Sequence, residues 1–266
     1  MVNARLVGVI HLPALPGSPL SRRKVSDIAR EAVSSAGALA LAGFDLCMIE
    51  NYGDVPFFRG AVPAVTVAAM TACAVAVREA HPDLPLGVNV LRNDAAAALS
   101  IAAVVGAGCV RVNVLTGARV TDQGIIEGGA AELLRTRRLL GAEDIAIWGD
   151  VDVKHSAPLA PGAIEQETSD LVVRALADAV LVTGEGTGRS VDVEKLARVR
   201  SAIRKSGARI PVLVASGATL DTLASLSAHA DGVVVGSALR ADGRAGGPVD
   251  PEAARRFADG FRSAFG

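Results

Sequence analysis

The 266-residue sequence has few aromatic side chains: six Phe, one Tyr and one Trp. A large core must therefore be built from aliphatic residues, and apolar residues do make up half of the chain. This balance is typical of a parallel sheet that helices cover on both faces. The formal net charge is only −1 and no basic stripe with interleaved aromatics occurs, so the sequence predicts no binding to nucleic acid.

Cysteines and long hydrophobic runs are scarce as well. Cys47, Cys73 and Cys109 lack the spacing of metal ligands and lie inside apolar segments, which predicts buried, unpaired thiols in a reducing compartment. No apolar run reaches the roughly 18 residues that a membrane-spanning helix needs. The residues that follow Met1 show no signal-peptide pattern. We therefore expect a soluble, cytoplasmic protein without a membrane span.

Short β-rich runs alternate with Ala-rich helical runs along the whole chain. Strands are predicted near Leu6–His11, Phe44–Glu50, Leu86–Leu91, Cys109–Val114, Ile145–Val153, Ala179–Thr183, Pro211–Ala215 and Gly232–Val235. Helices are predicted near Val25–Ala42, Ala64–Ala80, Ala95–Val105, Glu127–Leu140, Gln166–Ala177, Val193–Lys205, Leu220–Ser227 and Pro251–Ala264. Eight strand–helix repeats without a break in composition predict an α/β fold, a single (β/α)8 TIM barrel over residues 1–266.

A doubly wound open sheet is the main alternative to the barrel. Such a fold would place a glycine-rich, nucleotide-binding turn after its first strand. The run from His11 to Pro19 is too rich in proline to open a helix in that way. The sequence likewise shows no signature of a flavin, nicotinamide or pyridoxal phosphate enzyme.

Charged side chains occur in the predicted strand Ile145–Val153 and at the lysine that follows it. A barrel core would have apolar side chains at these positions. In a barrel strand, alternate residues face the central cavity and the surrounding helices. Asp150, Asp152 and Lys154 share one parity, so we expect all three side chains at the mouth of the cavity. Burying such a row unpaired would be costly, and a structural salt bridge is the alternative interpretation. We treat the three residues as candidate catalytic groups.

Polar side chains also end several other predicted strands, where barrel enzymes carry their chemistry. Glu50 and His11 join the candidate catalytic residues, although a helix cap and a bond to a backbone carbonyl are their structural alternatives. The candidate substrate-binding residues at these strand ends are Asn51, Asn89, Arg92, Arg111, Asn113, His155, Thr183 and Gly184.

Small residues follow the last two predicted strands, as Ser216-Gly217-Ala218 and Gly236-Ser237. Glycine lets backbone N–H groups approach an anion closely. Barrels commonly bind phosphate at the loops after strands seven and eight. Ser216, Gly217, Gly236 and Ser237 occupy those places, which predicts a phosphate site; glycines that merely turn the chain are the alternative.

Several runs of the sequence together resemble the BtpA family, also called BtpA/SgcQ. They are His11–Pro19, Glu50–Phe57, Gly87–Asp94, Arg111–Asn113 with Thr121–Gly124, Asp152–His155, Thr183–Gly184 with Thr187–Gly188, and Asp231–Ser237. The resemblance implies a barrel similar to the ribulose-phosphate-binding group, with a phosphosugar ligand. It also implies a link to photosystem I accumulation and to a nucleoside-triphosphatase label that some relatives carry.

Asp152-Val-Lys154 is similar to the Asp-x-Lys pair of barrel decarboxylases. That motif continues to a second Asp, and here Ala157 stands in its place. The departure argues against decarboxylation.

The first functional hypothesis is an enzyme acting on a phosphorylated sugar or nucleotide sugar. Glu50, Asp150 and Asp152 would hold Mg²⁺, stabilise an oxocarbenium ion or act as base. Lys154 would bind or protonate an anionic leaving group, and Arg111 would bind phosphate. Transfer or hydrolysis at the anomeric carbon is favoured over isomerase or aldolase chemistry, because adjacent aspartates oppose the neutral lysine that a Schiff base needs.

The second hypothesis is a non-catalytic assembly factor, as in photosystem I biogenesis. It requires an exposed apolar patch in place of converging charges. The expected partners are a phosphorylated small molecule and further copies of the chain in a homo-oligomer.

Overall fold

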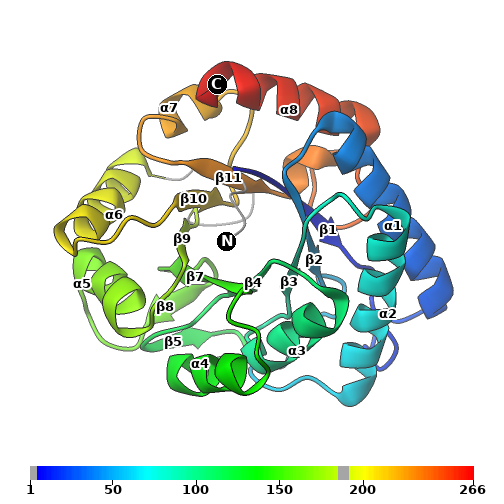
Figure 1. Ribbon diagram of the computed structural model, residues 1–266, viewed down its shortest axis with the longest axis horizontal. Helices are drawn as coiled ribbons and strands as arrows, with labels where there is room; N and C mark the ends of the chain where they lie inside the picture. The colour runs from blue at the N-terminus through cyan, green and yellow to red at the C-terminus, as the bar shows by residue number, and fades with distance from the viewer. Residues whose placement is uncertain (1–4, 185–191) are drawn as a thin grey trace.

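The computed structural model describes residues 5–184 and 192–266. Eight parallel strands close into a barrel, and the helices form a ring around it (Figure 1). In their order around the barrel the strands are β1 (Leu6–His11), β11 (Gly232–Val235), β10 (Val212–Ala215), β9 (Ala179–Val182), β7 (Ala146–Val151), β4 (Cys109–Val112), β3 (Leu86–Asn89) and β2 (Leu46–Glu50). The predicted (β/α)8 barrel is thereby confirmed.

The ring of helices follows the predicted pattern. Its members are α1 (Val25–Ala42), α2 (Ala64–Ala80), α3 (Ala95–Val105), α4 (Ala130–Leu139), α5 (Ile164–Ser169), α6 (Val193–Lys205), α7 (Leu223–Leu226) and α8 (Pro251–Phe265). A π-helical turn, Asp170–Arg174, continues α5, and a 3₁₀ turn, Ser237–Leu239, follows β11. Asp94, Asp192 and Asp250 cap α3, α6 and α8 by accepting backbone N–H bonds. No helix in the described part of the chain is long and apolar enough to cross a membrane.

The core has two layers because alternate residues of each strand face opposite sides. Aliphatic side chains and the single Trp148 fill the inside of the barrel, whereas a larger aliphatic layer lies between strands and helices. Alanine-rich helices can approach the strands closely. At Gly8, a Cβ atom would come within 2.4 Å of Leu39 on α1, so only glycine permits this approach. Cys47, Cys73 and Cys109 are buried and free, as predicted.

A small antiparallel sheet outside the barrel departs from the prediction. It consists of β5 (Ala118–Thr121), β6 (Gly124–Glu127) and β8 (Ser156–Pro158), in the order β6-β5-β8. Because β6 takes up Glu127, the predicted helix Glu127–Leu140 begins only at Ala130. The hairpin turns at Gly124, whose φ of 98° favours glycine. Strand β8 joins this sheet to the segment that follows β7.

Candidate active site

A cavity of about 180 Å³ opens among the C-terminal ends of the barrel strands. Eleven of the predicted site residues line it: His11, Glu50, Arg92, Arg111, Asn113, Lys154, His155, Ser216, Gly217, Gly236 and Ser237. They come from β1, β2, β4 and the segments after β3, β4, β7, β10 and β11, which lie far apart in the sequence. Only the closed barrel brings them together.

The register of neighbouring strands sets a row of polar side chains across one wall of the barrel. His11 pairs with Glu50, Glu50 with Asn89, and Asn89 with Arg111. All four are buried, so their polar atoms need partners inside the protein. Asn89 Nδ2 donates to Glu50 Oε2 at 2.7 Å, which fixes the orientation of this carboxylate.

His11 lies at one end of this row. Its Nδ1 accepts a hydrogen bond from the backbone N–H of Gly246 at 3.0 Å, so the neutral ring carries its proton on Nε2. Nε2 lies 3.8 Å from Glu50 Oε1. Burial, followed by the charges of Arg240 and Lys154, lowers the pKa of His11 well below its usual value. The ring stacks on Tyr52 with centroids 4.3 Å apart. His11 is therefore a neutral hydrogen-bond donor towards the cavity.

Arg111 and Asp150 form a buried ion pair beneath the cavity. Arg111 Nε and Nη2 donate to the two carboxylate oxygens of Asp150 at 3.1 and 2.9 Å. Asn113 Nδ2 donates to the same carboxylate at 2.5 Å. Asp150 thus accepts three hydrogen bonds and does not itself line the cavity, whereas Arg111 and Asn113 do.

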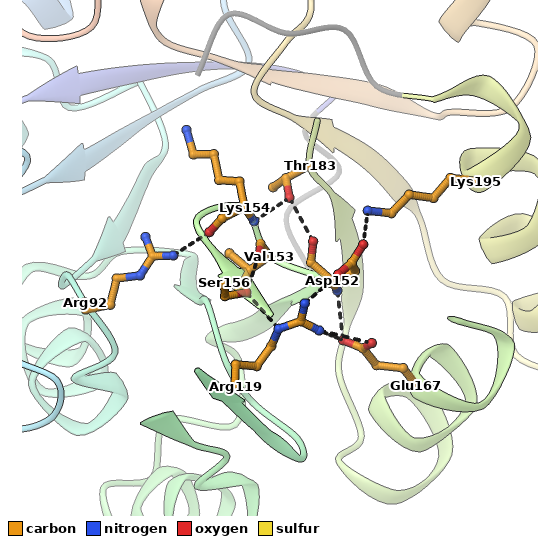
Figure 2. Close-up of polar contacts among 9 residues, drawn as sticks. All are labelled: Arg92, Arg119, Asp152, Val153, Lys154, Ser156, Glu167, Thr183 and Lys195. Atoms are coloured by element: carbon orange, nitrogen blue, oxygen red, sulfur yellow. Dashed lines mark hydrogen bonds and ion pairs between the residues drawn. The ribbon is translucent and has the colours of Figure 1, made fainter. Parts of the chain in front are cut away.

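Lys154 is held by bonds to its backbone as well as to its ammonium group. Its Nζ donates to Ser216 Oγ at 3.0 Å, on the loop after β10. Its backbone N–H donates to Thr183 Oγ1 at 3.0 Å, and its carbonyl accepts from Arg92 Nη2 at 2.7 Å (Figure 2). Burial lowers the pKa of Lys154, and the charge of Arg111 lowers it further against the opposing effect of Glu50 and Asp150.

The predicted cluster of Asp150, Asp152 and Lys154 does not form. Strand β7 ends at Val151, and Asp152 has a φ of 47°, so the alternation that the prediction assumed stops before Asp152. Figure 2 shows Asp152 turned towards Arg119 and Lys195, away from the Lys154 ammonium group. The carboxylate of Asp152 lies 2.5 Å from each of these two cations.

Asp152 belongs to a network of hydrogen bonds and ion pairs that connects the turn after β7 with β5 and α5. Its backbone N–H donates to Glu167 Oε1 at 2.8 Å, and Arg119 bonds Glu167 and Ser156 as well (Figure 2). Burial raises the pKa of Asp152, but the hydrogen bonds from Lys195 and Arg119 outweigh this and leave it lowered.

The Mg²⁺ site predicted from Glu50, Asp150 and Asp152 is not assembled. Asp150 is committed to Arg111, and Asp152 lies outside the cavity with Arg119 and Lys195. Residues 5–184 and 192–266 contain no group of three or more His, Cys, Asp or Glu side chains arranged to hold a metal ion.

The remaining predicted residues have supporting positions. Asn51 accepts a bond from Leu91 N at 2.7 Å and thereby joins the loops after β2 and β3. Thr183 donates to the carbonyl of Asp152 at 3.3 Å besides accepting from Lys154, and Gly184 is buried beside it. Thr187 and Gly188 lie outside the described residues.

Two groups of residues escaped the sequence analysis. Tyr52 and Phe57 line the cavity, and their signal was their place in the family-like run Glu50–Phe57. Arg240 is buried behind Gly236, where it donates to the carbonyls of Val9 and Gly236 at 3.0 and 2.8 Å. Burial lowers its pKa to about 10. Nothing in the pattern around Arg240 distinguishes it from a surface arginine.

The sequence model of the BtpA family matches residues 2–262. The chain belongs to the BtpA family. It is 46% identical over 254 residues to an uncharacterized protein of Thermococcus kodakarensis, covering 96% of this chain and 94% of that protein. It is 39% identical over 262 residues to the photosystem I biogenesis protein BtpA of Synechocystis, covering 97% of this chain and 89% of that protein.

Solved structures with the same fold are far more distant in sequence. Thiamine phosphate pyrophosphorylase from Pyrococcus furiosus aligns with a TM-score of 0.57 at 15% identity, covering 98% of this chain and 97% of that one. The 3-keto-L-gulonate-6-phosphate decarboxylase from Vibrio cholerae aligns with a TM-score of 0.57 at 13% identity, covering 98% and 97%. At such identities the likeness concerns the barrel fold of this BtpA-family protein.

Proposed function

We propose that this protein is an enzyme acting on a phosphorylated sugar or nucleotide sugar, by transfer or hydrolysis at the anomeric carbon. One observation carries the proposal: Glu50 and Lys154 line the same small cavity, whose wall includes the small-residue loops after β10 and β11. A stability role alone would be met better by apolar residues than by buried charges of both signs.

The charge of the cavity favours an anionic ligand. Arg92, Arg111 and Lys154 line it, whereas Glu50 is the only carboxylate among its described lining residues. Ser216, Gly217, Gly236 and Ser237 supply small side chains at the two loops where barrels commonly bind phosphate. Lys154 connects these cationic residues with the small-residue loops, because its ammonium group donates to Ser216 on the loop after β10. We therefore propose that the phosphate group binds on this side of the cavity.

The reaction needs a base or a stabilising carboxylate, and a cation for the leaving group. In the proposed step, the bond between the anomeric carbon and the leaving phosphate oxygen breaks, and a bond to the oxygen of water or of an acceptor hydroxyl forms. Glu50 takes the proton of the attacking hydroxyl, and its charge stabilises the developing oxocarbenium ion. Lys154 offsets the negative charge on the departing phosphate.

Carbonyl chemistry through a Schiff base is a second candidate, and a specific observation favours it. Asp152, one of the two aspartates expected to keep Lys154 charged, pairs with Arg119 and Lys195 instead. Burial together with Arg111 lowers the pKa of the Lys154 amine against the opposing charges of Glu50 and Asp150. A lysine of this kind is suited to attack a sugar carbonyl, as in aldolases. Trapping a covalent adduct on Lys154 with borohydride distinguishes this reaction from transfer at the anomeric carbon.

The names of similar proteins agree with a phosphorylated ligand without identifying it. Two proteins that share the barrel are named for thiamine phosphate and 3-keto-L-gulonate-6-phosphate. The Synechocystis relative is named for photosystem I biogenesis, which is the assembly role that we considered as the alternative. Buried charges that converge on a cavity favour the enzyme.

The test is Glu50→Gln in a substrate screen that reads both binding and turnover. Thermal-shift measurements with phosphosugars and nucleotide sugars identify the ligand. Gln keeps the oxygen that accepts from Asn89, so the melting temperature should hardly change. Turnover should fall by about two to four orders of magnitude. Full turnover in this variant would contradict the proposal.

A further inference from the structure

A second cavity adjoins the candidate active site. It has a volume of about 320 Å³ and lies under the loop after β2. Phe57 and Leu91 line both cavities, so the two are neighbours that share a wall. None of the proposed chemistry uses the second cavity.

The second cavity is apolar where the first is charged. Phe57, Phe58, Val62, Leu91 and three prolines supply most of its lining. The chain has only eight Phe, Tyr and Trp residues in all. Three of them, Tyr52, Phe57 and Phe58, lie in one stretch of seven residues in this loop. Phe58 is 54% exposed, which is costly for a phenyl ring that serves packing alone.

The polar groups in the lining select the kind of apolar ligand. Asp54 is the only charged residue among the described lining residues, so a second phosphate is disfavoured there. Ser18 also lines the cavity, and its buried hydroxyl oxygen makes no hydrogen bond with any described residue. A flat ring that carries N–H donors or ring nitrogens would bond such groups while its faces contact phenyl side chains.

The volumes of the two cavities also indicate a ligand that occupies both. Small-molecule sites commonly have volumes of about 300–1,000 Å³. The charged cavity, at about 180 Å³, falls below this range, whereas the two neighbouring cavities together fall within it. A ligand larger than a simple phosphosugar would therefore extend past Phe57 into the apolar cavity.

We propose that the cavity lined by Phe57 and Phe58 is a subsite for a heteroaromatic ring, such as a nucleobase, covalently joined to the phosphorylated sugar. The inference rests on the proposed function, because it takes the phosphate to lie against Lys154 and the loops after β10 and β11. It narrows the substrate class to nucleotide sugars, in which the phosphate that leaves the anomeric carbon also carries the ring.

The experiment compares four probes by titration calorimetry on the full chain: ribose 5-phosphate, adenosine and uridine 5′-monophosphates, and n-octyl phosphate. The tighter nucleotide should bind at least about fivefold more tightly than ribose 5-phosphate, since stacking of a base on an aromatic side chain has this minimum effect. Phe58→Ala should remove most of this gain and leave the affinity for ribose 5-phosphate unchanged. Arg59→Ala, an exposed neighbour that lines neither cavity, is the matched control.

Each other outcome contradicts either the ring subsite or the proposed function. Equal affinity for ribose 5-phosphate and both nucleotides, or a gain that survives Phe58→Ala, would refute the ring subsite and leave the proposed function standing. Tighter binding of n-octyl phosphate than of either nucleotide would replace the ring by an alkyl chain. If no phosphorylated probe binds, the proposed function fails and the subsite fails with it.

Discussion

Arg111 and Asp150 meet in a two-pronged ion pair beneath the cavity, with both side chains almost completely buried. Burial lowers the pKa of Arg111, but the carboxylates of Asp150 and Glu50 outweigh this and leave it raised. Asp150 is thus the fixed counter-ion of a cation that faces the cavity. Its place on β7, the strand next to β4, holds Arg111 still for a ligand.

Arg111→Met should destabilise the fold strongly, because it leaves Asp150 buried without a counter-ion. We expect the free energy of unfolding, measured by urea denaturation near neutral pH, to fall by about 3–5 kcal/mol. The double variant Arg111→Met/Asp150→Asn should recover much of this loss. A fall below about 1 kcal/mol in the single variant would mean that Asp150 does not depend on Arg111.

His11 should make the stability depend on pH on the acidic side of neutrality. Its pKa is lowered in the folded protein, so the unfolded chain binds a proton below about pH 6.5 that the folded protein refuses. Stability should therefore fall as the pH drops below that value, by up to roughly 1.4 kcal/mol per pH unit, until the folded pKa is reached. In His11→Gln this part of the slope should disappear.

Urea denaturation at several pH values between neutral and about pH 5 measures the slope. His229→Gln, at the opposite end of the barrel on the turn before β11, is the matched control and should keep the wild-type slope. Identical slopes in the wild type and in His11→Gln would show that His11 is not held neutral.

Ser216 combines backbone strain with a contact to Lys154, and two substitutions separate them. Its φ of 83° is costly for any residue with a Cβ atom, by roughly 1–2 kcal/mol. Ser216→Ala keeps the strain and removes the hydroxyl, whereas Ser216→Gly removes both. Ser216→Gly should be the more stable of the two in urea denaturation. Both should bind inorganic phosphate about tenfold more weakly than the wild type. Equal stability of the two variants, or unchanged phosphate affinity, would contradict this account.

The network around Asp152 should support the turn that presents Lys154. Asp152→Asn should cost about 1 kcal/mol, since the carboxylate is half exposed. Arg119→Met should cost more, because Asp152 and Glu167 both lose this buried cation. The lowered pKa of Asp152 stabilises the fold above about pH 3.8, and this contribution should vanish as the pH falls through the folded pKa. Urea denaturation of both variants tests the order, and a larger loss in Asp152→Asn would reverse it.

The barrel could be predicted from the sequence because each strand and each helix carries its own hydrophobic period. The polar row from His11 to Arg111 was also visible, since parallel strands present their C-terminal ends together. Parity failed at Asp152, because a single residue with positive φ ends the alternation and nothing in the run Ile145–Lys154 signals it.

Other parts of the site could not be predicted for a different reason. The pairing of Arg119 with Asp152 depends on a hairpin, and almost all of it lies between a predicted strand and a predicted helix, where no element was predicted. Tyr52 stacks on His11, and Arg240 bonds the carbonyl of Val9, only because β1, β2 and β11 are neighbours in the closed barrel. Contacts of this kind are set by tertiary structure, and a single sequence does not contain their geometry.

Lys154 provides the most direct test of the claim that the charged cavity binds a phosphorylated sugar. Titration calorimetry should compare the wild type and Lys154→Met with ribose 5-phosphate, glucose 1-phosphate and uridine diphosphate glucose. At least one ligand should bind the wild type with Kd below about 1 mM, and Lys154→Met should weaken it at least about tenfold. Failure of all three ligands to bind, or equal affinity in the two proteins, would contradict the account.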